Sequence, residues 1–440
     1  MKRRRFLYTP IQLIVIYLVL TLCLFKWGAY SWNVDEPLYF WLLNGLYILS
    51  LVLGYIFGMV WKTNRFSSTE KTFRNKNQCF FLLAILSFGC TYLEIIRGLG
   101  LNTINLLEVI NRLKIALIDP SALYMYSYSD EFFGNFGGGI VTITILMLQP
   151  VVFSIVPLYA FWYSSLKLKN KIVGFLVIIM QLIKWISSGK NKGIFDILIY
   201  FGVVILIKLF RRNVSGRKLG IKNKITIILL VFAGGFSIFH FGNMVNARLG
   251  GAWETYCIGG YSVNLSSPLL EFLPDKLKGL GTYLTMYLTQ GYQALSLIIS
   301  MQWIPMWGIG YSKFLVEYMD KYFNTNIASF TYQYRLIEYG WDPNLNWHTL
   351  YLYIANDTGL LGCSLALIAL GALISITYYE TLYQNSALSL LMLVQLVIVC
   401  LYIPANNIIF NHIGSFYVFY TIFLIWIVSK TTLIKRKIHF

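Results

Sequence analysis

The chain has 440 residues, of which 57% are hydrophobic and only 12% charged, and its mean hydropathy is +0.63. These values exclude an ordinary soluble domain and predict a polytopic membrane protein. The formal net charge is +18 (36 − 18). The basic residues cluster in short stretches between apolar segments, which indicates topology signals and anionic lipid rather than nucleic acid.

The N-terminus carries Met1-Lys2-Arg3-Arg4-Arg5 before its first apolar run. This order resembles a signal peptide, but no small-x-small cleavage site follows. We therefore expect an uncleaved first helix. The six cysteines are scattered and mostly lie inside apolar runs, so we interpret them as small core residues rather than metal ligands.

Eleven apolar stretches are long enough to be considered as membrane helices, since about 20 residues cross the hydrocarbon. They are about 10–31, 38–61, 79–97, 140–163, 171–188, 193–210, 225–241, 282–302, 350–378, 386–403 and 408–429. The polar and aromatic content of 282–302 favours a re-entrant or interfacial segment, which leaves ten firm spans. The alternative is a further helix hidden in residues 302–318.

Basic residues at both chain ends and between spans orient the helices with both termini in the cytoplasm. Long loops at 98–139, 242–281 and 303–349 then face outward. The sequence thus predicts an all-α polytopic protein of about 10–12 transmembrane helices, forming one integral membrane domain over residues 1–440. Two long outward-facing loops flank the segment 282–302.

His348 lies directly before an apolar run and is separated by ten residues from Gly359. We expect its imidazole where a spanning helix meets water, with Gly359 and Gly362 permitting close helix contact. Near its ordinary pKa of about 6.5, such a histidine can act as a general base. The alternative is a polar residue that merely ends a transmembrane helix.

Two lysines, Lys190 and Lys192, occupy a hairpin between the fifth and sixth spans that the count places outside. Cations on the side that topology disfavours suggest an anionic ligand such as a pyrophosphate. The alternatives are a pair of lysines that snorkel to the interface, or a hairpin that is cytoplasmic after all.

Two arginines are further candidates. Arg248 ends the seventh span and is separated by ten residues from Gly259, whereas Arg335 lies in the second long loop. Guanidinium groups bind phosphate through paired hydrogen bonds. For Arg335, an ion pair with Glu338 three residues on is an alternative.

The loop 303–347 mixes Trp and Tyr with Asn, Gln and Asp. This mixture suits carbohydrate, although aromatic residues are also common at membrane interfaces. The sequence has no metal-spaced His/Cys/carboxylate cluster, no GK[ST] loop, no GxSxG and no DxD pair. We therefore do not expect nucleotide hydrolysis. A reaction that uses an already activated, lipid-linked donor, without metal or cofactor, fits this absence.

With these motifs the chain resembles the bacterial O-antigen polymerase and ligase superfamily of GT-C-like membrane glycosyltransferases, and specifically its repeat-unit polymerases. Ser187 to Gly193 is similar to the family's serine-rich, basic segment at the lipid pyrophosphate, with Lys190 where Arg is usual. The spacing from Arg248 to Gly259 is similar to the pattern in the family's first large loop. His348 to Gly359 is similar to its histidine motif, although Thr349 departs from it. The family's second loop has the same arginine-to-glycine spacing, which this chain lacks. The position that would hold the glycine, after ten intervening residues from Arg335, is Asn346.

The resemblance implies a bacterial inner-membrane enzyme that joins undecaprenyl-pyrophosphate-linked oligosaccharides into O-antigen, capsule or exopolysaccharide. His348 and Arg248 would then be catalytic, whereas Lys190, Lys192, Gly259, Arg335 and Gly359 would bind substrate. Implied partners are membrane lipid, a chain-length regulator and a flippase. A ligase of the same superfamily and a transporter of lipid-linked sugars are the alternatives, and a transporter predicts repeated halves and charges deep in the spans.

Overall fold

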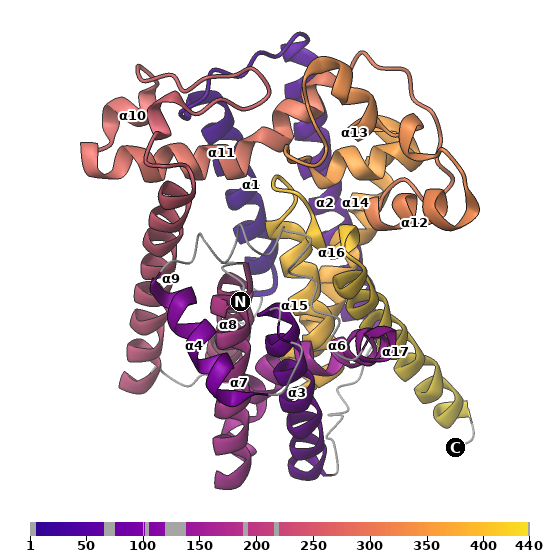
Figure 1. Ribbon diagram of the computed structural model, residues 1–440. Coiled ribbons are helices and arrows are strands. Elements are labelled where there is room, and N and C mark those ends of the chain that lie inside the picture. Colours follow the sequence, from indigo (N-terminus) through magenta and orange to yellow (C-terminus); the bar gives the residue numbers. More distant parts are fainter. Residues whose placement is uncertain are drawn as a thin grey trace. The chain divides into compact units, whose positions relative to one another are not determined.

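The computed structural model describes residues 6–65, 75–99, 101, 105–118, 138–187, 192–214 and 220–438. Within these residues the chain is helical, and the only strand-like pairings are the isolated bridges Tyr30–Val263 and Ile258–Tyr261. Figure 1 shows the helices and their order along the chain. The expected all-helical membrane architecture is therefore confirmed for the part of the chain that the structure describes.

Eight helices in the described residues are long and apolar enough to cross a membrane. They are α1 (Thr9–Trp27), α2 (Pro37–Arg65), α3 (Lys76–Gly98), α6 (Gly138–Trp162), α8 (Lys192–Val214), α9 (Ile221–Arg248), α14 (Leu350–Gln384) and α17 (Ile413–Ile438). Two other predicted spans also form helices, α7 (Leu168–Ser187) and the shorter α15 (Ala387–Leu401). The protein is therefore a multi-pass membrane protein, and the cytoplasmic position of its ends stays a prediction.

The chain folds into two compact units. Unit 1 comprises Met1–Ser67, Leu249–Tyr379 and Gln395–Phe416, and unit 2 comprises Ser68–Arg248, Glu380–Val394 and Tyr417–Phe440. Of the three predicted outward loops, 242–281 and 303–349 are described, but residues 100, 102–104 and 119–137 of the loop 98–139 lie outside the described residues.

In unit 1, α2 and α14 pack so closely that glycine is required on both. A Cβ at Gly54 would collide with the Ile368 carbonyl, and one at Gly371 would collide with the Leu51 carbonyl. Glycine removes that obstacle and lets two membrane helices approach backbone to backbone. This close contact lies at residues 368–371 in the middle of α14.

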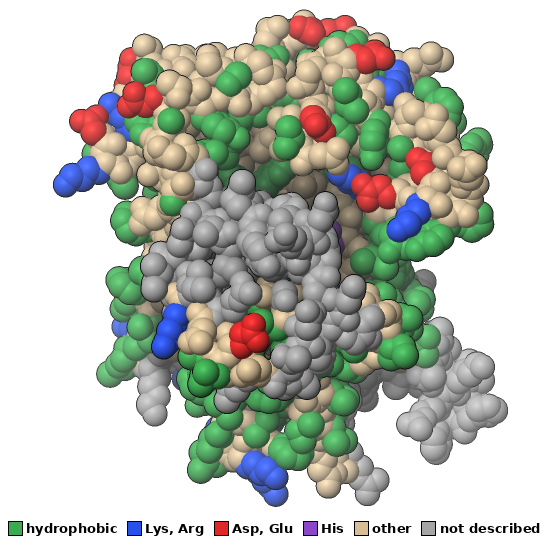
Figure 2. Space-filling view, viewed as in Figure 1, with side chains coloured by type: hydrophobic (Ala, Val, Ile, Leu, Met, Phe, Trp, Pro, Cys, Tyr) green, Lys and Arg blue, Asp and Glu red, His purple; other side chains and the backbone are tan. Residues whose placement is uncertain are grey.

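Across one end of α1, α2 and α14 lies the cap, which we define as residues 249–349. It contains α10 (Pro268–Phe272), α11 (Asp275–Leu297), α12 (Lys313–Phe323) and α13 (Tyr332–Arg335). Figure 2 shows acidic and basic side chains spread over this cap. The cap is therefore the polar part of unit 1, and it covers the start of α14.

The predicted re-entrant segment 282–302 belongs mostly to α11, which is not among the eight membrane-crossing candidates. Figure 1 shows α11 lying across the end of α1. Its buried threonines bind the connection between α1 and α2: Thr285 Oγ1 accepts the Ala29 N–H at 3.2 Å, and Thr289 Oγ1 accepts the Trp32 Nε1–H at 2.9 Å. These polar contacts explain the low hydropathy of α11, because its inner face binds backbone and indole groups instead of lipid.

Unit 2 holds α3, α4 (Leu106–Ile118), α6, α7, α8 and α9, together with parts of α15 and α17. Its helices partly bury a charged pair, in which Lys184 Nζ on α7 lies 2.6 Å from Glu94 Oε1 on α3. Gln149 on α6 donates to the same oxygen at 2.7 Å. One carboxylate therefore links three helices of this unit.

Candidate functional site

His348 lies in unit 1 near the C-terminal end of the cap, two residues before α14 begins at Leu350. Its backbone is fixed, since its carbonyl accepts the Asn406 N–H at 3.1 Å. Its side chain has 0% exposed surface, and neither ring nitrogen has a hydrogen-bond partner among the described residues. Buried polar groups are nearly always paired in folded proteins. An orphaned imidazole on a fixed backbone is thus available to a group that is absent from the protein itself.

Burial, together with a smaller effect of the Lys313 ammonium, lowers the pKa of His348 to about 3. This corrects the expectation of a pKa near 6.5, because a charged imidazole would lose its hydration without gaining a partner. At neutral pH the ring is uncharged and one of its nitrogens carries a free lone pair. The imidazole is therefore in the state that accepts a proton, although burial weakens its basicity.

Lys313 is the cation of this site, and the sequence analysis did not single it out. It begins α12 directly after Ser312, whose Oγ caps the helix by accepting the Leu315 N–H at 3.3 Å. Its Nζ donates to the side-chain oxygen of Asn344 at 2.9 Å and lies 3.7 Å from a Glu317 carboxylate oxygen. The cap thus holds a lysine close to the neutral histidine.

Gly259 supports the histidine segment through two tryptophans. Its backbone has a positive φ of 53°, and a Cβ there would stand 2.5 Å from the Trp341 ring. Trp341 is fully buried and donates from Nε1 to the Trp347 carbonyl at 3.3 Å, one residue before His348. The structure thus connects two of the predicted positions, Gly259 and His348, by packing.

Gly359 has a positive φ of 69° and interrupts α14 with a kink. Asp357, just before it, accepts the backbone N–H groups of Gly308 at 2.7 Å, Gly310 at 3.0 Å and Tyr311 at 2.7 Å. A carboxylate with three such donors holds the 308–311 segment firmly. The ten residues from His348 to Gly359 therefore contain the attachment of the cap to α14.

Arg335 has a structural role in the described contacts. It donates from Nη1 to the Gln302 carbonyl at 2.7 Å, and its guanidinium lies 5.7 Å from the centre of the Tyr332 ring. The alternative partner considered from the sequence was Glu338, but the guanidinium is engaged with these two groups instead. Arg335 thereby ties Gln302, the residue before the loop 303–349, to α13.

The remaining predicted cations belong to unit 2. Lys192 begins α8, and its Nζ lies 2.5 Å from the carboxylate of Asp196 one turn later. Lys190 lies outside the described residues, and so does the side chain of Arg248, which ends α9. Lys192 and Asp196 therefore form an ion pair between residues one turn apart on the same helix.

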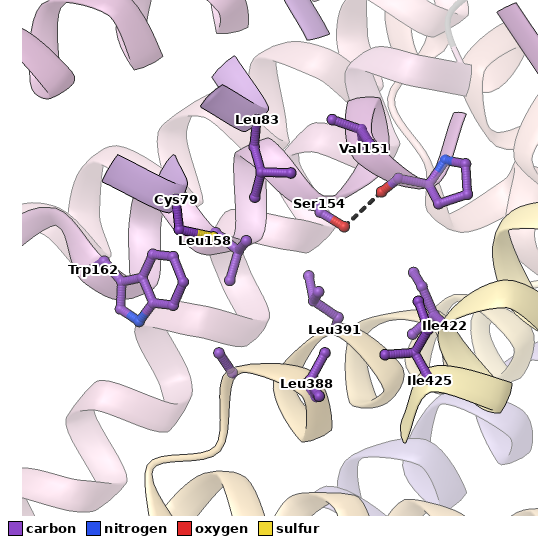
Figure 3. A pocket seen from close by; sticks show the side chains of 12 residues that line it. Cys79, Leu83, Val151, Ser154, Leu158, Trp162, Leu388, Leu391, Ile422 and Ile425 are labelled. Atoms are coloured by element: carbon purple, nitrogen blue, oxygen red, sulfur yellow. Dashed lines mark hydrogen bonds between the residues drawn. The ribbon is translucent and has the colours of Figure 1, made fainter. Parts of the chain in front are cut away.

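Unit 2 also contains an apolar cavity of about 190 Å³ between α3, α6, α15 and α17, shown in Figure 3. Leu83, Leu391 and Ile422 are among its lining residues. The hydroxyl of Ser154 at its wall is occupied, since it donates to the Pro150 carbonyl at 2.6 Å. A cavity with this lining suits hydrocarbon chains and offers no group for catalysis.

Comparison of the chain with protein-family models, with curated proteins and with solved structures yields no match. The candidate site therefore rests on its own geometry. That geometry consists of a buried, unpartnered, neutral imidazole with a lysine beside it under a cap rich in aromatic and amide side chains.

Proposed function

We propose that this protein is a membrane glycosyltransferase that polymerises undecaprenyl-pyrophosphate-linked oligosaccharide repeat units, with His348 as the general base. The observation that carries the proposal is the complete burial of a histidine whose two ring nitrogens have no partner in the described residues. A structural histidine is normally held by at least one hydrogen bond. An acceptor hydroxyl would supply the missing partner.

In the proposed reaction the neutral imidazole of His348 takes the proton of an acceptor sugar hydroxyl. The oxygen then bonds to the anomeric carbon of the donor glycan while the bond from that carbon to the pyrophosphate oxygen breaks. The electron pair leaves with undecaprenyl pyrophosphate, and the imidazolium returns its proton to water. Lys313, the cation next to the ring, favours negative charge developing nearby. Arg248 stays the arginine that the sequence predicts for the pyrophosphate.

The closed site implies that substrate enters by displacing part of its cover. Lys313 and Asn344 are hydrogen-bonded to each other, whereas the backbone of His348 is held by the Asn406 N–H. In this proposal the segment that carries Lys313 moves, and the backbone of His348 stays in place. Water reaching the imidazole would raise its pKa towards the ordinary value, because the desolvation that lowers it would be relieved.

The test is a gel of surface glycan and lipid-linked precursors from a deletion strain that carries wild type, His348→Gln or His240→Gln. The glutamine keeps approximate side-chain size, and His240 on α9 provides a histidine outside the cap. We expect long chains with wild type and His240→Gln. With His348→Gln at normal protein level, we expect single repeat units on the final acceptor.

Three other results would each contradict the proposal in a different way. Full-length polymer with His348→Gln removes the general-base role. Absence of glycan of any length on the acceptor, with precursor accessible on the outer face, indicates a ligase. Precursor that stays on the cytoplasmic face indicates a transporter of lipid-linked sugars.

A further inference from the structure

The turn 303–311 is attached to the kink of α14 by several hydrogen bonds. The Asn356 carbonyl accepts both the Trp303 Nε1–H at 3.1 Å and the Met306 N–H at 3.1 Å. The Asp357 carboxylate accepts the N–H groups of residues 308, 310 and 311 of the turn. The Trp303 ring packs against Gly359, since a Cβ at that glycine would lie 3.4 Å from the ring. The turn and the kink therefore form one rigid feature.

This feature holds Trp307 in an exposed and strained position. Its φ is +53°, a left-handed backbone that a bulky residue rarely adopts, and 87% of its surface is exposed. Strain of this kind persists only where the surroundings impose it. The anchored neighbours on both sides impose it here, and the result is an indole that projects from unit 1.

The burial of α14 changes at Gly359. Tyr351, Leu352 and Tyr353, before the kink, are each at most 2% exposed, whereas Leu361 is 64% and Leu365 73% exposed. These two leucines are one turn apart on the same face. An apolar stripe of this kind is the surface that a membrane helix presents to lipid.

The length of α14 agrees with this change. The helix has 35 residues, more than the hydrocarbon requires. The 20 steps from Gly359 to Tyr379 span about 30 Å at 1.5 Å per residue, which is the thickness of the hydrocarbon core. The charged Asp357 would lie just outside that interval, as desolvation costs require.

We propose that the indole of Trp307, with Trp303 beside it, is a lipid-interface anchor of the cap, and that the hydrocarbon boundary lies at Gly359. Its partner is the headgroup and glycerol layer of a phospholipid bilayer. Indoles prefer that layer because one edge is apolar and the N–H seeks a polar partner. Trp303 lies against Gly359, two residues before Leu361, where the lipid-facing stripe begins.

This inference does not depend on the proposed function, but it relocates the candidate site. The nine helical residues Leu350–Thr358 add about 13 Å between the boundary and the end of α14 next to His348. His348 then stands above the lipid surface inside the cap. The sequence had suggested a histidine at the membrane surface itself.

The experiment measures the depth of nitroxide labels in nanodiscs of phosphatidylglycerol and phosphatidylethanolamine. Labels are placed singly at Trp307→Cys, Leu345→Cys and Leu365→Cys, after serine replaces the three cysteines that are not buried, Cys23, Cys79 and Cys257. The ratio of oxygen to Ni(II)-chelate accessibility rises with depth. We expect the ratio to be highest at 365, intermediate at 307 and lowest at 345, which is a cap residue with 77% exposure.

Two results would overturn the inference. A label at 307 as accessible to nickel as the one at 345 places the indole in water, where stacking on a glycan would become its better explanation. A label at 307 inaccessible to both reagents places it against protein.

A second measurement covers the case in which the labelled variant does not fold. Brominated lipid should quench wild type more than Trp307→Phe, whereas Trp341→Phe, which removes a fully buried indole, should not reduce the quenched signal. Equal quenching of wild type and Trp307→Phe would refute the anchor.

Discussion

The buried side chains of Asn356 and Gln333 are joined by a hydrogen bond of 2.9 Å, from Nδ2 of the asparagine to Oε1 of the glutamine. Asn356 also accepts the Tyr332 N–H at 2.8 Å and donates to the Gly310 carbonyl at 3.0 Å. One amide on α14 therefore satisfies groups from two separate segments of the cap. It acts as the centre of the cap's attachment.

We expect Asn356→Ala to lower the stability of unit 1 markedly. The change leaves three buried partners without hydrogen bonds, and each such group costs about 1–3 kcal/mol. The measurement is the thermal unfolding midpoint of purified protein in detergent. The control is Asn326→Ala, which changes an exposed asparagine of the cap and should shift the midpoint little. Equal midpoints for the two variants would contradict the role of Asn356 in attaching the cap to α14.

Gly259 and Gly260 form a matched pair for separating packing from backbone strain. Both have positive φ, 53° and 87°, but only a Cβ at Gly259 meets a neighbour, the Trp341 ring. Alanine should cost about 1 kcal/mol at either position through strain. At Gly259 we expect an added loss of about 1–3 kcal/mol from overpacking.

The test compares the unfolding midpoints of Gly259→Ala and Gly260→Ala. If Gly260→Ala proved as damaging as Gly259→Ala, the contact with Trp341 would not explain the glycine. The proposed polymerase activity should stay close to wild type in Gly260→Ala, whereas in Gly259→Ala it should fall in step with stability.

The Glu94–Lys184 pair should be strongly coupled. Lys184→Met leaves a carboxylate in a largely buried place without its cation, and breaking such a pair typically costs about 3–5 kcal/mol. The double variant Glu94→Gln with Lys184→Met should recover much of that loss, because no unpaired charge remains. Thermal unfolding of the two single variants and the double variant gives the coupling.

The control for this cycle is Lys278→Met, which breaks the pair with Asp275, a side chain that is 93% exposed. A surface pair contributes at most about 1 kcal/mol. A loss with Lys184→Met no larger than that with Lys278→Met would show that the buried pair is not needed for stability.

Much of the helical framework follows from composition alone. Apolar runs predicted every membrane-crossing helix in the described residues, because a lipid-facing helix is recognisable from its own side chains. The same reasoning set segment 282–302 apart by its polar content. The threonines of α11 explain that content through contacts with residues more than 250 positions earlier.

The chemistry of the site was less accessible. His348 was predicted from its motif, but its low pKa depends on burial by the cap and on Lys313, 35 positions away in sequence. The sequence around Lys313 does not indicate that this lysine lies close to His348. Asn356 and Asp357 did carry a signal, since both are polar residues inside an apolar run. That these two side chains hold the cap could not be predicted, because the sequence does not show that the turn 303–311 lies against them.

The buried His348 predicts a specific dependence of stability on pH. Its pKa is about 3 in the folded protein and about 6.5 when unfolded, so between these values the unfolded state binds more protons. The contribution of the neutral His348 side chain to the free energy of unfolding is therefore complete above about pH 6.5, and it is lost as the pH falls towards 3. Within this window stability should fall by up to about 1.4 kcal/mol per pH unit from this group.

His348→Gln should remove that part of the slope, because glutamine does not titrate, and His240→Gln should keep it. The measurement is the unfolding midpoint of the three proteins in detergent from pH 7.5 to pH 4.5. Parallel profiles for wild type and His348→Gln would mean that the imidazole is already hydrated or partnered in the folded protein. The ring would then be accessible at rest, and the proposed mechanism would not require the segment that carries Lys313 to move.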